Sequence, residues 1–227
     1  MEQPDLLFRI ASLLIPLVFA IVLHEISHGW VANAFGDPTA KEQKRLSPNP
    51  IRHVDPVGTV ILPLVLAVTG APVFGWAKPV PVVAERMRKP RVHMMLVALA
   101  GPGMNLLLAL LAALTLAFVL ALVAAPVGFW TMFALANLDN FIWLNVFLAV
   151  FNMLPVPPFD GGHVVEGVLP RRMVGGWRRL GRYAFPILIL LLLVLPMISP
   201  RLSVVAWLVV PPVESLLHLI HAIAGLS

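Results

Sequence analysis

The residues best suited to do chemistry are His24, Glu25 and His28, which form an HExxH pattern inside a long apolar segment. On an α-helix, residues four apart lie on one face about 6 Å apart along the axis, so two imidazoles can bind one tetrahedral metal ion. Glu25 would lie beside the ion and could take a proton from a bound water. A polar side chain costs on the order of 2.5–3.5 kcal/mol at the centre of a bilayer, which disfavours a chance occurrence. The pattern predicts a zinc site.

Such a site needs a third protein ligand and keeps one position open for water. The candidates by residue type are His53, Asp55, Asp139, Asp160, His163 and Glu166. Asp139 lies roughly 20 residues before Asp160 on one expected helix, about 30 Å away, and is excluded by distance. His163 is too close to Asp160 to exclude by spacing. A turn role for Asp160, in Pro-Pro-Phe-Asp-Gly-Gly, is equally consistent with the residues alone.

The composition indicates that lipid surrounds much of the chain. Of its 227 residues, 59% are hydrophobic and only 12% are charged, whereas soluble domains carry about 25% charged residues. We expect an all-α polytopic membrane protein with about five transmembrane helices. The expected helices are 6–35, 93–125, 129–154 and a C-terminal pair at 183–198 and 202–224. We expect one membrane domain over 1–227, with a catalytic core at 6–168 and the C-terminal pair within 183–225. The absence of cysteine excludes disulfides and thiolate ligands.

The segment 57–74 is apolar, but it contains two glycines and two prolines and is flanked by basic loops. These features predict a re-entrant hairpin or broken half-helix instead of a full span. Residues 74–82 alternate in a β-like manner, as an edge strand would.

The basic residues predict the topology. Fourteen of the 16 Lys and Arg residues lie in three loops, 37–56, 75–92 and 170–182, and basic loops usually face the cytoplasm. We therefore expect the N-terminus outside, a multi-pass protein of the cell membrane, and an active site towards the cytoplasmic side. The net charge of +5 is then explained without a nucleic-acid partner. Because Glu2 and Asp5 make the region before Leu6–Leu23 acidic, this stretch is expected to be a retained helix and not a signal peptide.

The HExxH pattern, together with the run Asn-Met-Leu-Pro-Val-Pro-Pro-Phe-Asp-Gly at 152–161, resembles the site-2 protease family of intramembrane zinc metalloproteases. The likeness extends to the short form without PDZ or CBS domains and covers most of 10–170. Phe159 stands where the family usually has leucine. The resemblance implies one zinc ion per chain, with Asp160 as the third ligand.

The resemblance also implies that Asn152 faces the site and hydrogen-bonds the substrate backbone or the developing oxyanion. A purely helix–helix role for this amide is the alternative. The motif of Gly101, Gly103 and Asn105 is attributed mainly to helix packing. The region 57–82 resembles the family's re-entrant region, where an unwound substrate is thought to pair with a strand edge.

The implied activity is hydrolysis of peptide bonds in or near transmembrane segments, with membrane proteins as substrates. Two other functions compete with it. A metal transporter would be expected to show polar residues along a whole pathway, whereas the polar residues here gather at one depth. An inactive relative that only binds membrane proteins would not need a general base such as Glu25. The sequence leaves the substrate and the oligomeric state open.

Overall fold

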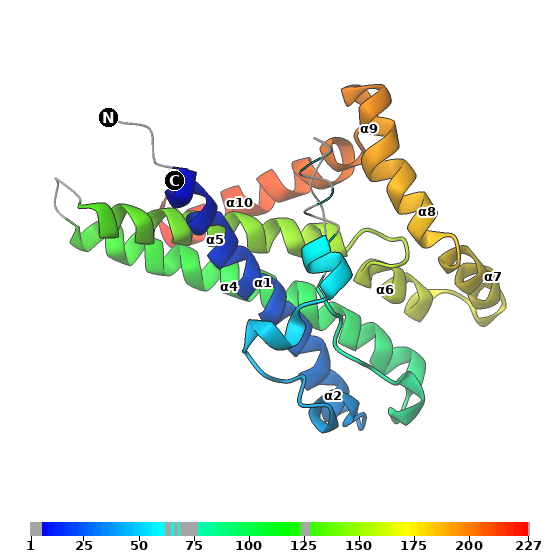
Figure 1. The fold of residues 1–227 in the computed structure, drawn as a ribbon. Coiled ribbons are helices and arrows are strands. Elements are labelled where there is room, and N and C mark those ends of the chain that lie inside the picture. The colour runs from blue at the N-terminus through cyan, green and yellow to red at the C-terminus, as the bar shows by residue number, and fades with distance from the viewer. Residues whose placement is uncertain (1–5, 62–64, 66–67, 69–76, 124–127, 227) are drawn as a thin grey trace.

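The computed structural model describes residues 6–61, 65, 68, 77–123 and 128–226, and long helices dominate it (Figure 1). In this described part, four helices are long and apolar enough to cross a membrane: 6–34, 90–122, 129–152 and 205–224. A further pair, 171–181 and 186–198, is bent by 65° and would make a fifth if it crosses. The expectation of a helical, multi-pass membrane protein is therefore confirmed, with four to five candidate spans where about five were expected.

The long helices are α1 (Leu6–Ala34), α4 (Pro90–Leu122), α5 (Phe129–Asn152) and α10 (Val210–Ala224). Between α1 and α4 lie the short elements α2 (Thr39–Glu42), η1 (Pro50–His53), η2 (Pro56–Ile61) and η3 (Ala84–Arg86). After α5 come α6 (Asp160–Val168), α7 (Arg171–Gly181), α8 (Ala184–Ile189), η4 (Leu190–Val194), α9 (Leu195–Ile198), η5 (Pro200–Leu202) and η6 (Val205–Val209). Helices α1, α4 and α5 begin or end up to three residues from their predicted bounds, whereas the predicted helix 202–224 is divided into η6 and α10.

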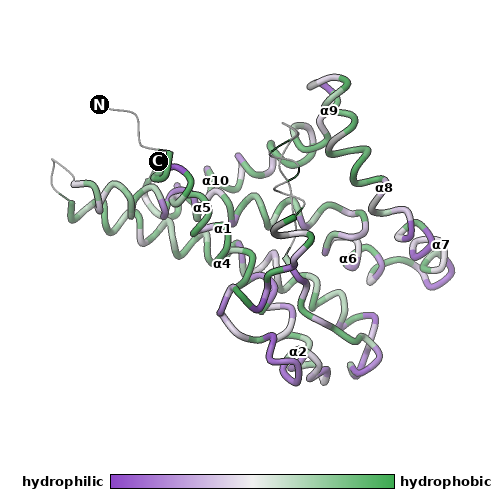
Figure 2. The backbone as a smooth tube through the Cα atoms, viewed as in Figure 1, coloured by the Kyte–Doolittle hydropathy of each residue, from purple (hydrophilic) through white to green (hydrophobic). Residues whose placement is uncertain are grey.

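Helices α1, α4 and α5 pack against one another, α6 packs on α4, and α10 packs on α4 and α5. Small residues of α4, such as Ala109 and Ala113, are fully buried against Ile142 and Val146 of α5. Small side chains let helices approach closely in a membrane, where lipid contact competes with packing. The hydropathy colouring shows apolar long helices and polar segments around α2 and α7 (Figure 2).

Proline at position 16 does not break α1, because the structure satisfies the carbonyl that it leaves free. Pro16 has no N–H to donate to the carbonyl of Ser12, and this carbonyl instead accepts a hydrogen bond of 2.9 Å from Asn140 Nδ2 of α5. In the C-terminal region, the π-helical turns η4 and η6 end two residues before Pro196 and Pro211, respectively. A proline ring displaces the carbonyl four residues earlier, and the wider π turn accommodates it.

The predicted re-entrant hairpin and β-like segment at 57–82 are not supported. The structure has a π-helical turn at Pro56–Ile61 and an extended segment without strand pairing at 77–83; most of 62–76 lies outside the described residues. Pro79 and Pro81 lack the N–H that one edge of a ladder requires. The N–H group of Lys78 donates to the carbonyl of His53 at 2.8 Å. The N–H group of Val80 donates to Glu25 Oε2 at 2.7 Å. The alternating sequence therefore corresponds to an extended segment whose N–H groups bond to a loop carbonyl and to a side chain, and not to a neighbouring strand.

Candidate metal centre

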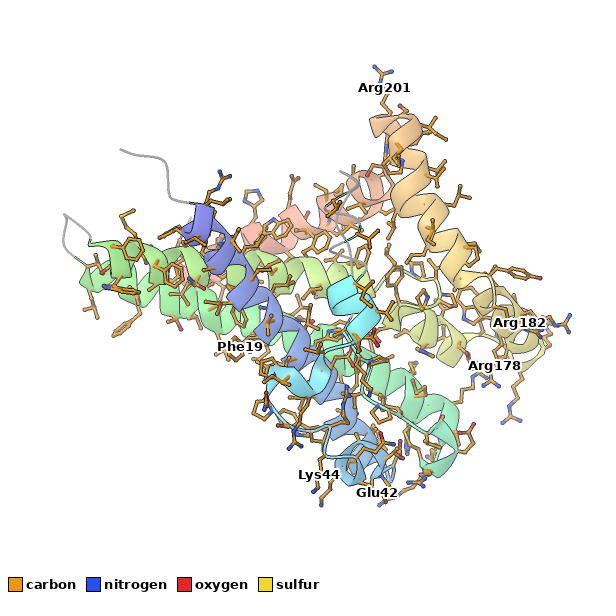
Figure 3. The ribbon with its side chains drawn as sticks, viewed as in Figure 1. Phe19, Glu42, Lys44, Arg178, Arg182 and Arg201 are labelled. Carbon is orange, nitrogen blue, oxygen red and sulfur yellow. The ribbon has the colours of Figure 1, made fainter. Side chains whose placement is uncertain are left out.

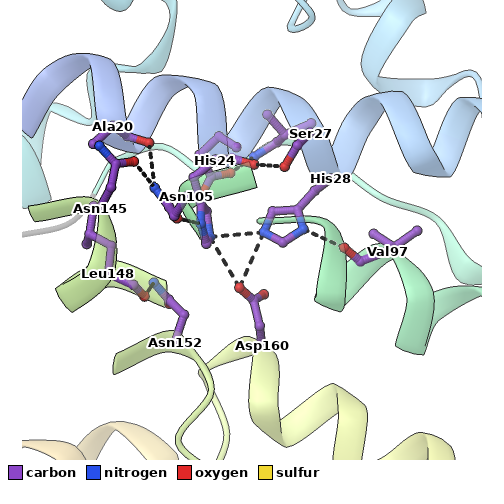
Figure 4. Close-up of polar contacts among 12 residues, drawn as sticks. Ala20, His24, Ser27, His28, Val97, Asn105, Asn145, Leu148, Asn152 and Asp160 are labelled. Carbon is purple, nitrogen blue, oxygen red and sulfur yellow. Dashed lines mark hydrogen bonds and ion pairs between the residues drawn. The ribbon is translucent and has the colours of Figure 1, made fainter. Parts of the chain in front are cut away.

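Three side chains from two distant parts of the chain converge at one point (Figure 4). His24 Nε2 lies 3.1 Å from His28 Nε2, and Asp160 Oδ2 lies 3.2 Å and 3.4 Å from these two nitrogens. Both histidines are buried on α1, and the half-buried Asp160 is the first residue of α6. Within the described residues, this is the group of His, Asp and Glu side chains with metal-binding spacing.

The other ring nitrogen of each histidine determines which nitrogen faces this point. His24 Nδ1 lies 2.5 Å from Asn105 Oδ1, and His28 Nδ1 lies 2.7 Å from the carbonyl oxygen of Val97. Both partners are oxygens that only accept, so each Nδ1 carries the proton and donates. In a neutral imidazole the Nε2 lone pair is then free, and both lone pairs are directed at Asp160 Oδ2.

This donor set fits zinc. Two imidazole lone pairs and a carboxylate oxygen repel one another unless a cation lies between them, and Asp160 Oδ2 is a buried atom that accepts no hydrogen bond. Bonds of 2.0–2.1 Å in a tetrahedron place ligand atoms about 3.3 Å apart, close to the observed 3.1–3.4 Å. Two histidines and one carboxylate would leave a fourth position open, as catalytic zinc sites do.

Two glycines allow the backbone to approach closely enough to form the centre. A Cβ atom at Gly101 of α4 would lie 2.5 Å from His24 Cε1 and from His28 Nε2. A Cβ atom at Gly161 would collide with the carbonyl oxygens of Met153 and Leu154. A larger residue at Gly101 must therefore move α4 away from the histidines. A larger residue at Gly161 must move Asp160 away from them.

Glu25 is half-buried and lies outside the group of three. Its Oε2 atom accepts the hydrogen bond from Val80 in the extended segment 77–83. The same segment is attached at its other end, because the N–H of Val83 donates to Asp37 Oδ2 at 2.6 Å. Arg45 Nη2 also donates to the carbonyl of Lys78 at 2.7 Å.

The charge state of Asp37 strengthens this attachment. Burial of the side chain raises its pKa, but hydrogen bonds from Thr39 and Val83 and the nearby charge of Arg86 lower it more, so the pKa of Asp37 lies below its usual value. The charged form of Asp37 is therefore the form that the folded protein stabilises.

The remaining predicted residues lie in other surroundings. Asn152, the last residue of α5, is half-buried and donates from Nδ2 to the carbonyl of Leu148 at 2.9 Å. His163 is exposed and lines a cavity of about 180 Å³ with Glu166 and Trp177, whose indole donates to the carbonyl of Gly162.

The other candidate ligands also have local structural partners or exposed positions. His53 Nε2 lies 2.9 Å from the carbonyl of Ser47, and Asp55 Oδ1 accepts from the N–H groups of Val57 and Gly58. Asp139 is exposed on α5. Of all the candidate third ligands, the structure brings Asp160 to the two histidines.

Asn105 and Asn145 belong to the surroundings of the centre and were missed by sequence reasoning in this role. The motif of Gly101, Gly103 and Asn105 was attributed to packing; this is correct for Gly101 but not for Gly103, whose Cβ would meet nothing within 4 Å. The available signal was the lone amide of Asn105 in α4 and the presence of Asn145 among four asparagines in the apolar helix α5, since an unpaired amide is unfavourable there. Their partners, however, become visible only in three dimensions.

Comparison with known proteins agrees with this geometry. The model of peptidase family M50 matches residues 12–137 and 123–195. YwhC of Bacillus subtilis, named as a candidate zinc metalloprotease, is 37% identical over 199 residues, which cover 86% of this chain and 84% of YwhC. The similarly named Rip2 protein of Mycolicibacterium smegmatis is 29% identical over 66% of this chain and 54% of its own length. Rip2 of Mycobacterium tuberculosis is 30% identical over 65% of this chain and 53% of its own length. No solved structure matches the chain at a comparable level.

Proposed function

The chain belongs to peptidase family M50, the site-2 protease family, and is a membrane zinc metalloprotease; we propose that it hydrolyses peptide bonds in or near the transmembrane segments of other membrane proteins. The observation that carries the proposal is the convergence of His24 Nε2, His28 Nε2 and Asp160 Oδ2 within 3.4 Å of one another. These donors lie in a bundle of helices apolar enough to cross a membrane. Substrates that lie in the bilayer can reach such a site laterally.

In the proposed reaction, His24, His28 and Asp160 would hold one zinc ion, and this ion would supply Lewis-acid polarisation of the scissile carbonyl and of a water molecule. Glu25 accepts the proton of that water and passes it to the leaving amine. The N–H of Val80 donates to Oε2 of Glu25, and we propose that Oε1 takes the proton. The same hydrogen bond restricts rotation of this side chain.

Asn152 is proposed to stabilise the oxyanion of the substrate. One N–H of its amide donates to Leu148, and the second N–H is the group that can donate to a substrate oxygen. The basic loops support an orientation with the centre towards the cytoplasm, where water reaches it from the cytoplasmic side.

The activity is tested by co-expressing the wild type or Glu25→Gln with a library of single-span membrane proteins and identifying fragments by mass spectrometry. Glu85→Gln, at an exposed glutamate of η3, is the matched control. We expect new termini within or beside the spans with the wild type and Glu85→Gln. With Glu25→Gln we expect at least a hundredfold fewer, because general bases typically contribute about 10²–10⁴. Identical fragments with Glu25→Gln, or cuts confined to soluble domains, contradict the proposal.

A further inference from the structure

We infer that Asn145 and Asn105 form a hydrogen-bond relay that fixes the tautomer and orientation of His24, and that both are positioning residues for the metal centre. The inference rests on the proposed role of His24 as a ligand. The relay starts at the backbone of α5, crosses α4 and ends on α1 (Figure 4). Both asparagines have 0% exposed surface, so water cannot substitute for any partner.

The direction of the relay follows from one backbone carbonyl. Asn145 Nδ2 donates to the carbonyl of Phe141 at 2.7 Å, which turns its Oδ1 towards Asn105. Asn105 Nδ2 donates to this Oδ1 at 2.7 Å and to the carbonyl of Ala20 at 3.3 Å. With its amino group used in this way, Asn105 can present only Oδ1 to His24 Nδ1. His24 must then carry its proton on Nδ1, which leaves Nε2 free for the metal.

The two histidines differ in how this state is secured. His28 donates to the carbonyl of Val97, which cannot turn round within a helix. His24 depends on a side-chain amide that could rotate by half a turn and offer its amino group instead. Such a rotation would favour a proton on Nε2, the atom that faces Asp160. Asn145 prevents it without touching His24.

The test compares Asn145→Leu with Asn137→Leu, a matched control on α5 whose amide donates to the carbonyl of Phe133 in its own helix. Zinc affinity of the full chain in detergent is measured by competition with a chelator. The tautomer of His24 is read from ¹⁵N chemical shifts of the metal-free protein, assigned with His24→Gln. We expect Asn145→Leu to weaken zinc binding about 10–100-fold and to give a mixture of tautomers at His24, with Asn137→Leu like the wild type.

Asn145→Asp, which keeps an acceptor oxygen for Asn105, should restore the Nδ1–H tautomer and most of the affinity. If Asn145→Leu fails to fold, Asn145→Ala gives the same comparison without added bulk. An unchanged His24 tautomer in the folded variant overturns the inference even if zinc affinity falls, because the role is then only structural. An unchanged affinity overturns it as well. A wild type that binds no zinc would instead refute the proposed function, while the tautomer measurement would still judge the relay.

Discussion

At the level of single residues, Gly101 shows how closely α4 must approach the metal centre. The histidines present their Nε2 atoms to the face of α4 where this residue has only a hydrogen atom. A methyl group there would occupy space within 2.6 Å of both Nε2 atoms, which is inside van der Waals contact. The small residue thus leaves room for the proposed ion and its ligands.

We predict that Gly101→Ala lowers zinc affinity at least tenfold, in the range seen when the surroundings of metal ligands are disturbed. Gly103→Ala is the control, since its methyl group would lie in open space on the same helix. Chelator competition on both purified variants measures the effect. Equal zinc affinity of Gly101→Ala and Gly103→Ala would show that α4 does not limit the size of the site.

At this level the sequence predicted what depends on local spacing. His24, Glu25 and His28 were identified because helical periodicity alone places the two histidines together. Asp160 required a family motif, because its position relative to α1 depends on the path of several intervening helices. Asn145 had no motif, and its role follows from contacts with α4 that no local pattern encodes.

At the level of elements, the extended segment 77–83 connects the end of α1 to Glu25, the proposed general base. Val80 binds Glu25, and Val83 binds Asp37 in the turn after α1. Asp37 also accepts hydrogen bonds from the backbone N–H and the hydroxyl of Thr39. Loss of this one carboxylate should therefore loosen the segment that positions Glu25.

We predict that Asp37→Asn lowers the free energy of unfolding by about 1–3 kcal/mol at neutral pH, because charge-assisted hydrogen bonds are lost and an amino group faces N–H donors. The pKa of Asp37 is lower in the folded protein than in the unfolded chain. Its contribution is therefore complete above about pH 4 and disappears as the pH falls through the folded value. The free energy of unfolding of the wild type and of Asp37→Asn is measured by SDS titration in mixed micelles at pH 7 and at pH 3. A difference that stays constant or grows at pH 3 would contradict this role of the charge.

Hydropathy predicted the long helices well, since each span must be apolar along its length. It could not predict the π turns before Pro196 and Pro211, which depend on local steric relief. The alternation at 74–82 was misleading because alternating prolines and valines give an extended backbone with few donors, whereas a sheet needs a partner and N–H groups.

At the level of the whole molecule, the charges indicate how the bundle lies in the membrane. The start of α1 and the end of α10 lie at the same end of the bundle (Figure 1). Lys44 projects near α2 and Arg182 beside α7, both away from that end (Figure 3). Phe19, midway along α1, is 46% exposed. We propose that the chain crosses the membrane an even number of times, with the basic loops in the cytoplasm and these two ends outside.

We predict that single cysteines at Gln43, Glu85 and Arg201 in this cysteine-free chain are protected from a membrane-impermeant thiol reagent in intact cells. A cysteine at Gly128, at the start of α5, should be labelled and serves as the outside control. Labelling of only one of Gln43→Cys and Glu85→Cys would mean that the chain crosses the membrane between them. Labelling of Arg201→Cys would mean that the bent pair of 171–181 and 186–198 is a fifth span.

The central claim, that His24, His28 and Asp160 hold a catalytic zinc, is tested most directly by the metal content of the purified protein. The wild type, Asp160→Ala and His163→Ala are dialysed against a chelator at a concentration that leaves the zinc of the wild type in place. We predict one zinc per chain in the wild type and in His163→Ala, and less than a tenth of that amount in Asp160→Ala. His163 is the matched control because it lies three residues further along α6 yet outside the converging group. Stoichiometric zinc in Asp160→Ala, or its loss from His163→Ala, would contradict the account.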